Sequence, residues 1–331
     1  MDTTSDTAAA APMDALIHAA TVAAQAPSIH NTQPWQWRVR HNAADLYADT
    51  SRQLHVSDPD RRMLTVSCGV ALHHARVALA AAGVTVDVDL LPTASDPDHL
   101  GHITMTGATT IDPAAEALYD AIAARHTDRR ALLDQTLPPD TLPELRSSAR
   151  PFGIGIHPLR GRELAALSSA TETAQRASRL DAATRTELDA WASNDHRPPY
   201  AGIPIENLPN RRAPTVVPVR DFGHIGTLAT TGGHDTAATY AILYGPDDTV
   251  ECWLRAGETL SAVWLAATER GIALLPLSDA VEHPSTRAEL RRILGGHGYP
   301  AIAIRIGMPN LNQPAPPRTP RLPVAATVHV A

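Results

Sequence analysis

The sequence predicts an α+β fold made of two related halves, and three observations support this prediction. The chain has 331 residues, enough for about two domains of roughly 150 residues each. Two long alanine-rich stretches with helical periodicity, 63–82 and 251–270, each end at a glycine, Gly83 and Gly271, the residue type that most often follows a helix. Apolar stretches with the composition of strands follow both helices. We expect the boundary between the halves near residue 112.

The first half, residues 1–112, begins with an amphipathic helix at 13–25 that stops before Pro27, because proline cannot continue a helix. The strands of this half are predicted where apolar and polar residues alternate or β-branched residues gather, at 35–40, 45–48, 84–91 and 102–106. On the first strand, Trp35 and Trp37 are expected in the core.

The second half, residues 113–331, begins with a helix that Pro113 opens and that runs to about Arg125. Its other elements are predicted as strands at 152–157, 239–245 and 299–307, and as helices at 161–193, 251–270 and 285–294. Residues 194–236 contain six prolines and no regular period, which is typical of a lid, a binding loop or a disordered segment. The proline-rich tail from Pro309 is expected to be an extended arm.

The composition excludes several classes of function. The chain is 44% hydrophobic and 19% charged with a net charge of −7, which argues against a nucleic-acid partner or an anionic membrane. All 28 basic residues are arginine. Without lysine there is no Schiff base to pyridoxal phosphate, no Walker A lysine and no lysine general base. Arginine suits recognition of phosphate or carboxylate, although a GC-rich genome gives the same bias.

Cysteine usage and the N-terminus indicate a cytoplasmic protein. The chain has only two cysteines, Cys68 and Cys252, which cannot build a disulfide framework or a cysteine-based zinc site. The first twenty residues have neither the basic region nor the apolar core of a secretory signal. No stretch reaches the roughly 20 apolar residues that span a bilayer.

Several common site motifs are absent from the sequence. No G-x-G-x-x-G follows a strand, and neither G-x-S-x-G nor H-E-x-x-H occurs. Among the 16 histidines, His73 and His74 are adjacent and so point to different faces of a helix. His99 and His102 have no evident carboxylate or cysteine companion. We therefore expect no metal site.

A first candidate motif runs from Ala26 to Trp35, with the sequence APSIHNTQPW. Two prolines, Pro27 and Pro34, lie between a helix end and a strand start and make the loop rigid. Such a loop presents a hydroxyl, an amide and backbone N–H groups, which suits the edge of a planar heterocycle. Alternatively, Ser28 or Asn31 only bonds the local backbone and caps the connection.

A second candidate motif, Arg125-His126-Thr127-Asp128-Arg129-Arg130, follows a predicted helix. Three arginines and a hydroxyl within six residues form a compact cluster that suits a phosphate group. The alternative is a solvated helix end, because cations also favour a helix C-terminus.

Together with Pro-Arg-Thr-Pro-Arg at 317–321, these two motifs resemble the FMN-dependent nitroreductase superfamily. The arrangement is most similar to its Acg-like branch, in which one chain carries two nitroreductase-like halves. The resemblance extends from residue 13 to about residue 325. It implies a nitroreductase-like α+β fold whose two pseudo-symmetric halves imitate the nitroreductase homodimer.

The order of the motifs implies one composite site. Ordinary members are homodimers: one subunit gives an Arg-x-Ser/Thr motif and a C-terminal basic residue to the FMN phosphate, and the other gives a Pro-Ser-x-x-Asn loop to the flavin ring. Here the first half has the loop but no arginine within residues 1–25, and the second half has the arginine motif without such a loop after it. The resemblance therefore implies one FMN per chain and a monomer that imitates a dimer, with further dimerisation left open.

The resemblance assigns roles by position. The ribityl phosphate would be held by Arg125, Thr127 and Arg129, helped by Arg318 or Arg321. The isoalloxazine ring would be lined by Pro27, Ser28, Ile29 through its backbone, and Asn31. His30 is a neighbour that faces the site without an assigned role.

One segment departs from the family pattern. Leu275, Pro276 and Leu277 stand where members pass a short loop along the flavin face, and many members carry Glu-Gly there. The usual contact near the reactive N5 atom is therefore open in this chain. The family's lysine contacts are impossible here, so arginine or backbone N–H groups must stabilise the reduced flavin.

The resemblance implies an oxidoreductase in which FMN carries the chemistry, with no side-chain nucleophile or general base. NAD(P)H would reduce the flavin in a ping-pong cycle, and a small-molecule acceptor of quinone, nitroaromatic or flavin type would reoxidise it. An alternative is an FMN storage or sequestering protein in which residues 194–236 form a fixed lid. A third interpretation is a flavin-free pseudoenzyme that binds a partner.

Overall fold

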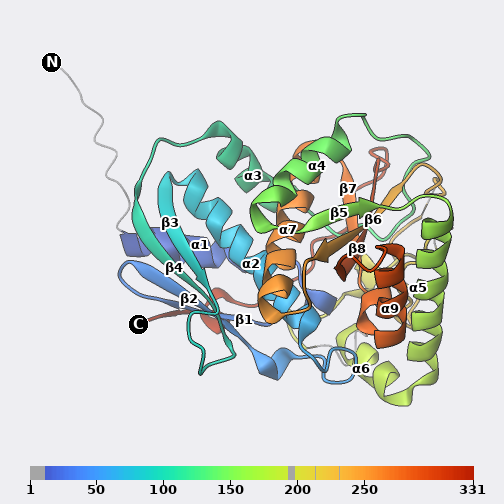
Figure 1. Ribbon diagram of the computed structural model, residues 1–331, viewed down its shortest axis with the longest axis horizontal. Helices are drawn as coiled ribbons and strands as arrows, with labels where there is room; N and C mark the ends of the chain where they lie inside the picture. Colours follow the sequence, from blue (N-terminus) through green and yellow to red (C-terminus); the bar gives the residue numbers. More distant parts are fainter. Residues whose placement is uncertain (1–11, 193–197, 213, 231) are drawn as a thin grey trace.

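The computed structural model describes residues 12–192, 198–212, 214–230 and 232–331. Two β-sheets lie on either side of a central pair of long helices, α2 (Arg62–Ala81) and α7 (Val250–Glu269), as Figure 1 shows. The α+β class predicted from the sequence is confirmed.

The first sheet has the strand order β3-β4-β2-β1-β9. Its strands are β1 (Trp35–Val39), β2 (Ala43–Ala48), β3 (Val84–Leu90), β4 (His99–Ala108) and β9 (Val328–Val330). All neighbours are antiparallel except β1 and β9, which pair in parallel with Trp37 opposite Val328. Trp35 and Trp37 are fully buried, as predicted.

The second sheet repeats this arrangement with the order β5-β6-β8-β7, all antiparallel. Its strands are β5 (Gly155–Pro158), β6 (Thr239–Gly245), β7 (Ala273–Leu277) and β8 (Tyr299–Gly307). In both sheets the long central helix connects the same two strands, β2 to β3 and β6 to β7. The two related halves are therefore visible in the topology. The boundary near residue 112 stays a prediction, and the predicted second half supplies β9 to the first sheet.

The remaining α-helices of the described residues are α1 (Pro12–Ala23), α3 (Pro113–Ala124), α4 (Thr141–Ala149), α5 (Arg162–Leu180), α6 (Ala182–Ala192), α8 (Asp279–Glu282) and α9 (Pro284–Ile293). The prediction of a single helical stretch at 161–193 is wrong, because the helix is interrupted at Asp181. The Asp181 carboxylate accepts a hydrogen bond from the backbone N–H of Thr184 (2.7 Å) and so starts a new helix. Helix α4 and strand β9 were not predicted.

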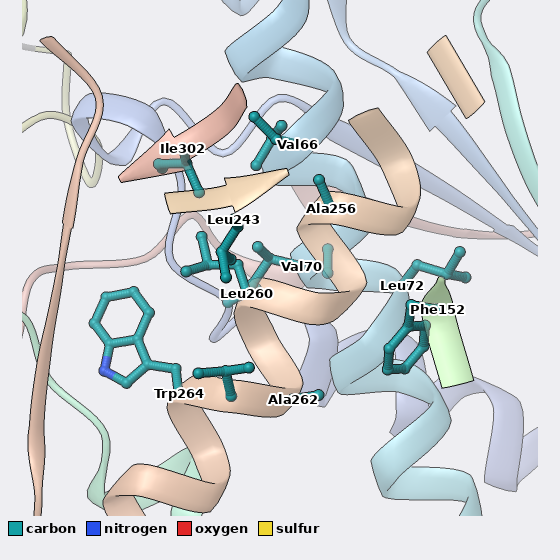
Figure 2. Packing of buried hydrophobic residues seen from close by; sticks show 14 of the residues in the cluster. Val66, Val70, Leu72, Phe152, Leu243, Ala256, Leu260, Ala262, Trp264 and Ile302 are labelled. Carbon is teal, nitrogen blue, oxygen red and sulfur yellow. The ribbon is translucent and has the colours of Figure 1, made fainter. Parts of the chain in front are cut away.

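Helices α2 and α7 pack closely because glycines face each other at their contact. A Cβ atom added to Gly257 would lie 2.1 Å from the carbonyl oxygen of Val66 and 2.8 Å from the Cα atom of Gly69. Setting Gly69 against Gly257 also sets Gly83 against Gly271, and both of these glycines have φ +68°. The two helices are thus counterparts, and apolar side chains fill the space around them (Figure 2).

The expectation that no segment is long and apolar enough to span a bilayer is wrong for helix α2. By length and composition it is apolar enough to do so, but 89% of its apolar window is buried inside the protein. Its apolar character is explained by its position between α7 and the first sheet.

Candidate functional site

The ring loop, residues 27–33, contains the predicted Pro-Ser-x-x-Asn motif and connects α1 to β1. Three of its residues, His30, Asn31 and Gln33, have φ angles of 46°, 56° and 53°. Residues other than glycine rarely adopt such angles, and they persist only where surrounding contacts hold them. A strained loop held in this way is typical of a functional site.

Two serine hydroxyls hold the ring loop in shape. The Ser28 hydroxyl accepts a hydrogen bond from the backbone N–H of Gln33 (2.9 Å), and the Ser67 hydroxyl on α2 accepts one from Ile29 (3.0 Å). The Ser28 hydroxyl therefore bonds the local backbone, as in the alternative interpretation of this motif.

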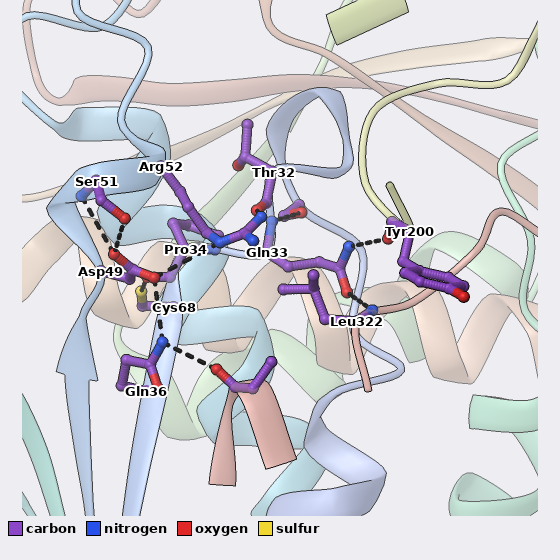
Figure 3. Close-up of polar contacts among 12 residues, drawn as sticks. Thr32, Gln33, Pro34, Gln36, Asp49, Ser51, Arg52, Cys68, Tyr200 and Leu322 are labelled. Carbon is purple, nitrogen blue, oxygen red and sulfur yellow. Dashed lines mark hydrogen bonds and ion pairs between the residues drawn. The ribbon is translucent and has the colours of Figure 1, made fainter. Parts of the chain in front are cut away.

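Gln33 joins the ring loop to two segments that are distant in sequence (Figure 3). Its Nε2 donates to the carbonyl oxygen of Tyr200 (2.9 Å), and its Oε1 accepts from the backbone N–H of Leu322 (2.9 Å). The ring loop thus contacts both the predicted lid and the C-terminal arm.

Asn31 makes the same connection and lines neither of the cavities described below. Its Nδ2 donates to the carbonyl oxygens of Gly202 (3.0 Å) and Pro320 (3.0 Å). Its Oδ1 accepts from Nη1 of Arg321 (3.1 Å). All polar groups of this side chain therefore have protein partners.

The ring cavity is a hollow enclosed by the ring loop, α2, α7 and β7. Eight predicted site residues line it: Pro27, Ser28, Ile29, Thr127, Arg129, Leu275, Pro276 and Leu277. Apolar side chains from the central helices and β8 form the other walls, including Val66, Val70, Leu260, Trp264 and Ile302 (Figure 2). An apolar cavity with a few fixed polar groups is the usual form of a cofactor site.

The segment Leu275-Pro276-Leu277 lines the ring cavity but is not the loop that was predicted. It belongs to β7, which is the edge strand of the second sheet. An edge position tolerates Pro276, because an edge strand leaves one side free of hydrogen bonds.

The anion cavity adjoins the ring cavity, and Thr127 lines both. Three predicted arginines line it: Arg125, Arg318 and Arg321. The arginine motif after α3 and the C-terminal arm are therefore brought together, as the resemblance implied. The lining also includes Asn207, whose Oδ1 is buried without a hydrogen-bond partner among the described residues.

Three arginines at these cavities carry buried N–H groups with no partner among the described residues. The groups are Nε and Nη1 of Arg125, Nη1 of Arg129 and Nε of Arg321. Arg125 is stacked on Trp264 at 4.6 Å from the ring centre, and Arg129 on Phe222 at 5.5 Å. Buried donors without partners are costly, so this arrangement favours a bound anion.

The charges of these arginines repel one another. Burial, together with the charges of Arg321 and Arg318, lowers the pKa of Arg125 to about 9. Burial and Arg318 lower the pKa of Arg321 to about 10. An anion placed among them would relieve both effects.

Part of the predicted lid, residues 194–236, lies against the ring cavity, and residues 194–197, 213 and 231 of this segment lie outside the described residues. Val219, Arg220 and Phe222 of the lid line this cavity. Phe222 meets His30 edge-on at 5.5 Å between ring centres. The cavity has a volume of about 110 Å³, below the roughly 300 Å³ of typical ligand pockets.

A buried ion cluster holds the lid at Arg220. Its Nη2 lies 2.8 Å from Oδ1 of Asp279 and 2.5 Å from Oε1 of Glu282, both on α8. Burial raises the pKa of Asp279 to about 6, partly offset by Arg220. Burial and the charge of Arg220 lower the pKa of His30 to about 3, so this imidazole stays neutral.

Sequence reasoning missed most of the other side chains that line the ring cavity, among them Trp264, Arg220, Phe222 and Asp279. Each is remote in sequence from both motifs, and no local pattern distinguishes them. It also missed the carboxylate beside two histidines. Oδ1 of Asp45 lies 2.9 Å from Nε2 of His99 and 2.6 Å from Nδ1 of His102, so the expectation that these histidines lack a companion is wrong.

Relatives in sequence identify the family of the chain. No protein-family model matches the chain. It is 35% identical over 316 residues to "Putative NAD(P)H nitroreductase Rv3131" of Mycobacterium tuberculosis, covering 93% of this chain and 89% of that protein. It is 32% identical over 327 residues to "Putative NAD(P)H nitroreductase acg" of the same organism, covering 96% of both.

The chain is also similar to two solved structures. A nitroreductase with bound FMN from Bacteroides fragilis is 14% identical, with a TM-score of 0.39, covering 61% of this chain and 93% of that one. The FMN and NADPH-dependent nitroreductase NfnB from sphigopyxis sp. is 16% identical, with a TM-score of 0.40, covering 63% and 96%. On the identity and coverage of its sequence relatives, the chain belongs to the nitroreductase family, in the branch that includes acg.

Proposed function

We propose that this protein binds FMN in the ring and anion cavities and acts as an oxidoreductase of nitroreductase type, with NAD(P)H as reductant. The observation that supports this most directly is the set of buried arginine N–H groups without partners beside an apolar cavity. Two relatives named as NAD(P)H nitroreductases support the reductant. Two buried cysteines without disulfide partners agree with a cytoplasmic location.

The residues present fit the cofactor. Arg125, Thr127 and Arg321 would hold the phosphate, with Arg318 at the rim of the anion cavity. The flavin ring would lie against the ring loop and between the apolar walls of α7 and β7. Arg129, expected at the phosphate, lines the ring cavity and not the anion cavity, and its buried Nη1 has no partner among the described residues.

We propose one such site per chain, because the counterpart positions are filled. With Gly69 set against Gly257, Val70 and Trp264 of the ring cavity correspond to Glu258 and Arg76. Arg76 Nη1 and Glu258 Oε1 lie 2.5 Å apart as an ion pair. Arg76 also stacks on Phe152 at 5.6 Å.

Charged and aromatic side chains thus replace the apolar walls at the counterpart position. A second planar ring would have to displace an ion pair there whose glutamate, Glu258, is buried. The chain would then be a monomer that imitates the family's dimer.

FMN held by the ring loop, Arg125 and Arg321 would supply hydride and electron transfer between NAD(P)H and a quinone, nitroaromatic or flavin acceptor. The chain's own residues bind and orient the reactants and exclude water. Ser67 and Ser28 fix the ring loop, and Arg129 provides positive charge where the family uses lysine. His30 is neutral at physiological pH, which suits a wall of the cavity.

The alternative function is storage or sequestration of FMN under the lid. Val219, Arg220 and Phe222 line the ring cavity, and the buried contacts of Arg220 with Asp279 and Glu282 hold this part of the lid in place. An enzyme must open this lid to admit nicotinamide. In a storage protein the lid can stay closed for as long as FMN is bound.

An anaerobic titration of the purified protein with NADPH and then NADH separates these functions. A yellow protein with one FMN per chain that bleaches with nicotinamide, and recovers with a quinone or nitroaromatic, supports the oxidoreductase. Bleaching by dithionite alone supports storage. A colourless protein that cannot be loaded with FMN would refute the composite site.

Two lid variants make the test sharper. Arg220→Met removes the buried cation, whereas Arg212→Met removes a lid arginine whose side chain is 70% exposed. If the lid alone prevents turnover, only Arg220→Met gains bleaching by NADPH. Should Arg220→Met fail to fold, limited proteolysis of the wild type with and without NADPH reports whether the lid opens.

A further inference from the structure

The outer face of the first sheet carries a row of polar side chains across neighbouring strands. Arg38 on β1 is opposite Asp45 on β2, which is opposite His102 on β4, which is opposite Asp89 on β3. His99 lies on the same face, since its partner in the ladder is Tyr47, two residues from Asp45. These side chains line neither the ring cavity nor the anion cavity, and they are not part of the hydrophobic core.

Asp45, His99 and His102 form a compact group within this row. The carboxylate oxygen of Asp45 and one ring nitrogen of each histidine all lie within 4.8 Å of one another. Oδ1 of Asp45 is 2.9 Å from Nε2 of His99 and 2.6 Å from Nδ1 of His102. The described part of the chain has no other group of three histidine, cysteine or acidic side chains at this spacing.

The surroundings of the group orient its ligand atoms. The hydroxyl of Thr93 lies 3.0 Å from Nδ1 of His99, which leaves Nε2 of that ring facing Asp45. The His99 ring is stacked on Tyr47 at 4.5 Å between ring centres and an angle of 15°. Such second partners fix the ring and its tautomer at metal sites.

We propose that Asp45, His99 and His102 bind a divalent transition metal of the Zn²⁺ class, with one coordination position open to water. Imidazole nitrogen and carboxylate oxygen are the ligands that Zn²⁺, Ni²⁺ and Cu²⁺ prefer, and three protein ligands plus water is a common zinc arrangement. Zinc bonds of about 2.0–2.2 Å need the ligand atoms somewhat further apart than hydrogen-bond distance. Small side-chain rotations provide this separation.

One cation opposes metal binding at this group. Nη2 of Arg40 lies 3.1 Å from Oδ2 of Asp45, but its side chain is 54% exposed. Arg40 therefore contacts the oxygen that the histidines leave free, and it can turn into solvent. Removal of Arg40 should strengthen the site, since one positive charge beside the metal is lost.

Zinc binding by the untagged, FMN-loaded full chain tests the proposal, with a chromophoric chelator as competitor after treatment with EDTA. The wild type should bind one Zn²⁺ per chain with a micromolar or lower Kd. His102→Ala should weaken binding at least tenfold, and Arg40→Ala should strengthen it. His329→Ala is the matched control, because His329 lies on the same face, bonds Gln36 and is outside the group.

A wild type that does not take up Zn²⁺ at tenfold excess overturns the proposal, as does a His102→Ala variant that binds like the wild type. X-ray absorption at the zinc edge of the wild type needs no variant to fold. Two imidazole ligands and oxygen are expected. One imidazole, or a sulfur ligand, would show that zinc binds elsewhere.

Discussion

Replacing Arg125 with methionine separates a binding role from a structural role for this residue. Methionine keeps an apolar, flexible side chain against Trp264, which the Arg125 guanidinium covers at 4.6 Å, but it removes the charge. Because Nε and Nη1 of Arg125 have no partners among the described residues, the substitution removes no hydrogen bond from these two groups to that part of the chain. It also removes the repulsion from Arg318 and Arg321.

The size of the effect follows from those two N–H groups. Each hydrogen bond to a charged partner contributes about 1.5–3 kcal/mol, so two of them contribute about 3–6 kcal/mol. The Kd for FMN should therefore rise by roughly 10²- to 10⁴-fold. The stability of the flavin-free protein should be unchanged or higher, because a buried, unpaired cation has been removed.

Flavin fluorescence quenching by the flavin-free protein measures the Kd, and urea unfolding measures the stability. Arg130→Met is the matched control: Arg130 donates from Nε and Nη2 to both carboxylate oxygens of Asp128, at 2.9 and 2.7 Å. It should lose stability and largely keep its FMN affinity. An Arg125→Met protein with FMN affinity within threefold of the wild type, or destabilised like Arg130→Met, refutes the reasoning.

Three further predictions concern the lid and the core. Burial in the closed lid raises the pKa of Asp279 to about 6, and opening of the lid should return this pKa towards about 4. The closed form therefore binds the proton more tightly, so proteolysis of the lid should increase as the pH rises from about 4 through 6. Asp279→Asn should flatten this pH profile. Gly257→Ala should lower the free energy of unfolding in urea by about 1–3 kcal/mol despite the better helix propensity of alanine, because its Cβ would meet the Val66 carbonyl; a stabilised variant would contradict this helix contact. Asp58→Ala should cost about 1 kcal/mol in the same assay, because Asp58 accepts hydrogen bonds from the first backbone N–H groups of α2, at 3.0 and 2.8 Å; no change would show that other groups cap this helix.

Local patterns predicted the elements whose structure depends on their own residues. The bounds of β6 and β8 agree with the prediction, and α2 and α7 agree within one residue at each end. Strand β9 has only three residues and exists because β1 offers it a partner, so no local pattern indicates it. The family resemblance predicted a loop at residues 275–277, whereas the structure has strand β7 there; the edge position that tolerates Pro276 is known only from the sheet order.

The site was predictable as far as its motifs are contiguous. Thr127 and the arginines around it are adjacent in sequence, so their anion-binding chemistry can be predicted from the sequence alone. Arg220 and Asp279 are separated by nearly sixty residues and become a pair only when the lid lies on α8. Asp45 and His102 meet through strand register, which depends on the alignment of β2 with β4 rather than on spacing along the chain.

The parallel pairing of β9 with β1 bears on how the protein is made. Trp37 pairs with Val328, which is synthesised roughly 290 residues later. The arm that carries Arg318 and Arg321 also emerges late from the ribosome. The first sheet and the anion cavity therefore stay incomplete during most of translation. Contacts of such long sequence separation also form slowly. Under the proposed function, FMN binding would then be a late event for the nascent chain, because a chain shortened before residue 318 would lack Arg318 and Arg321 of the anion cavity.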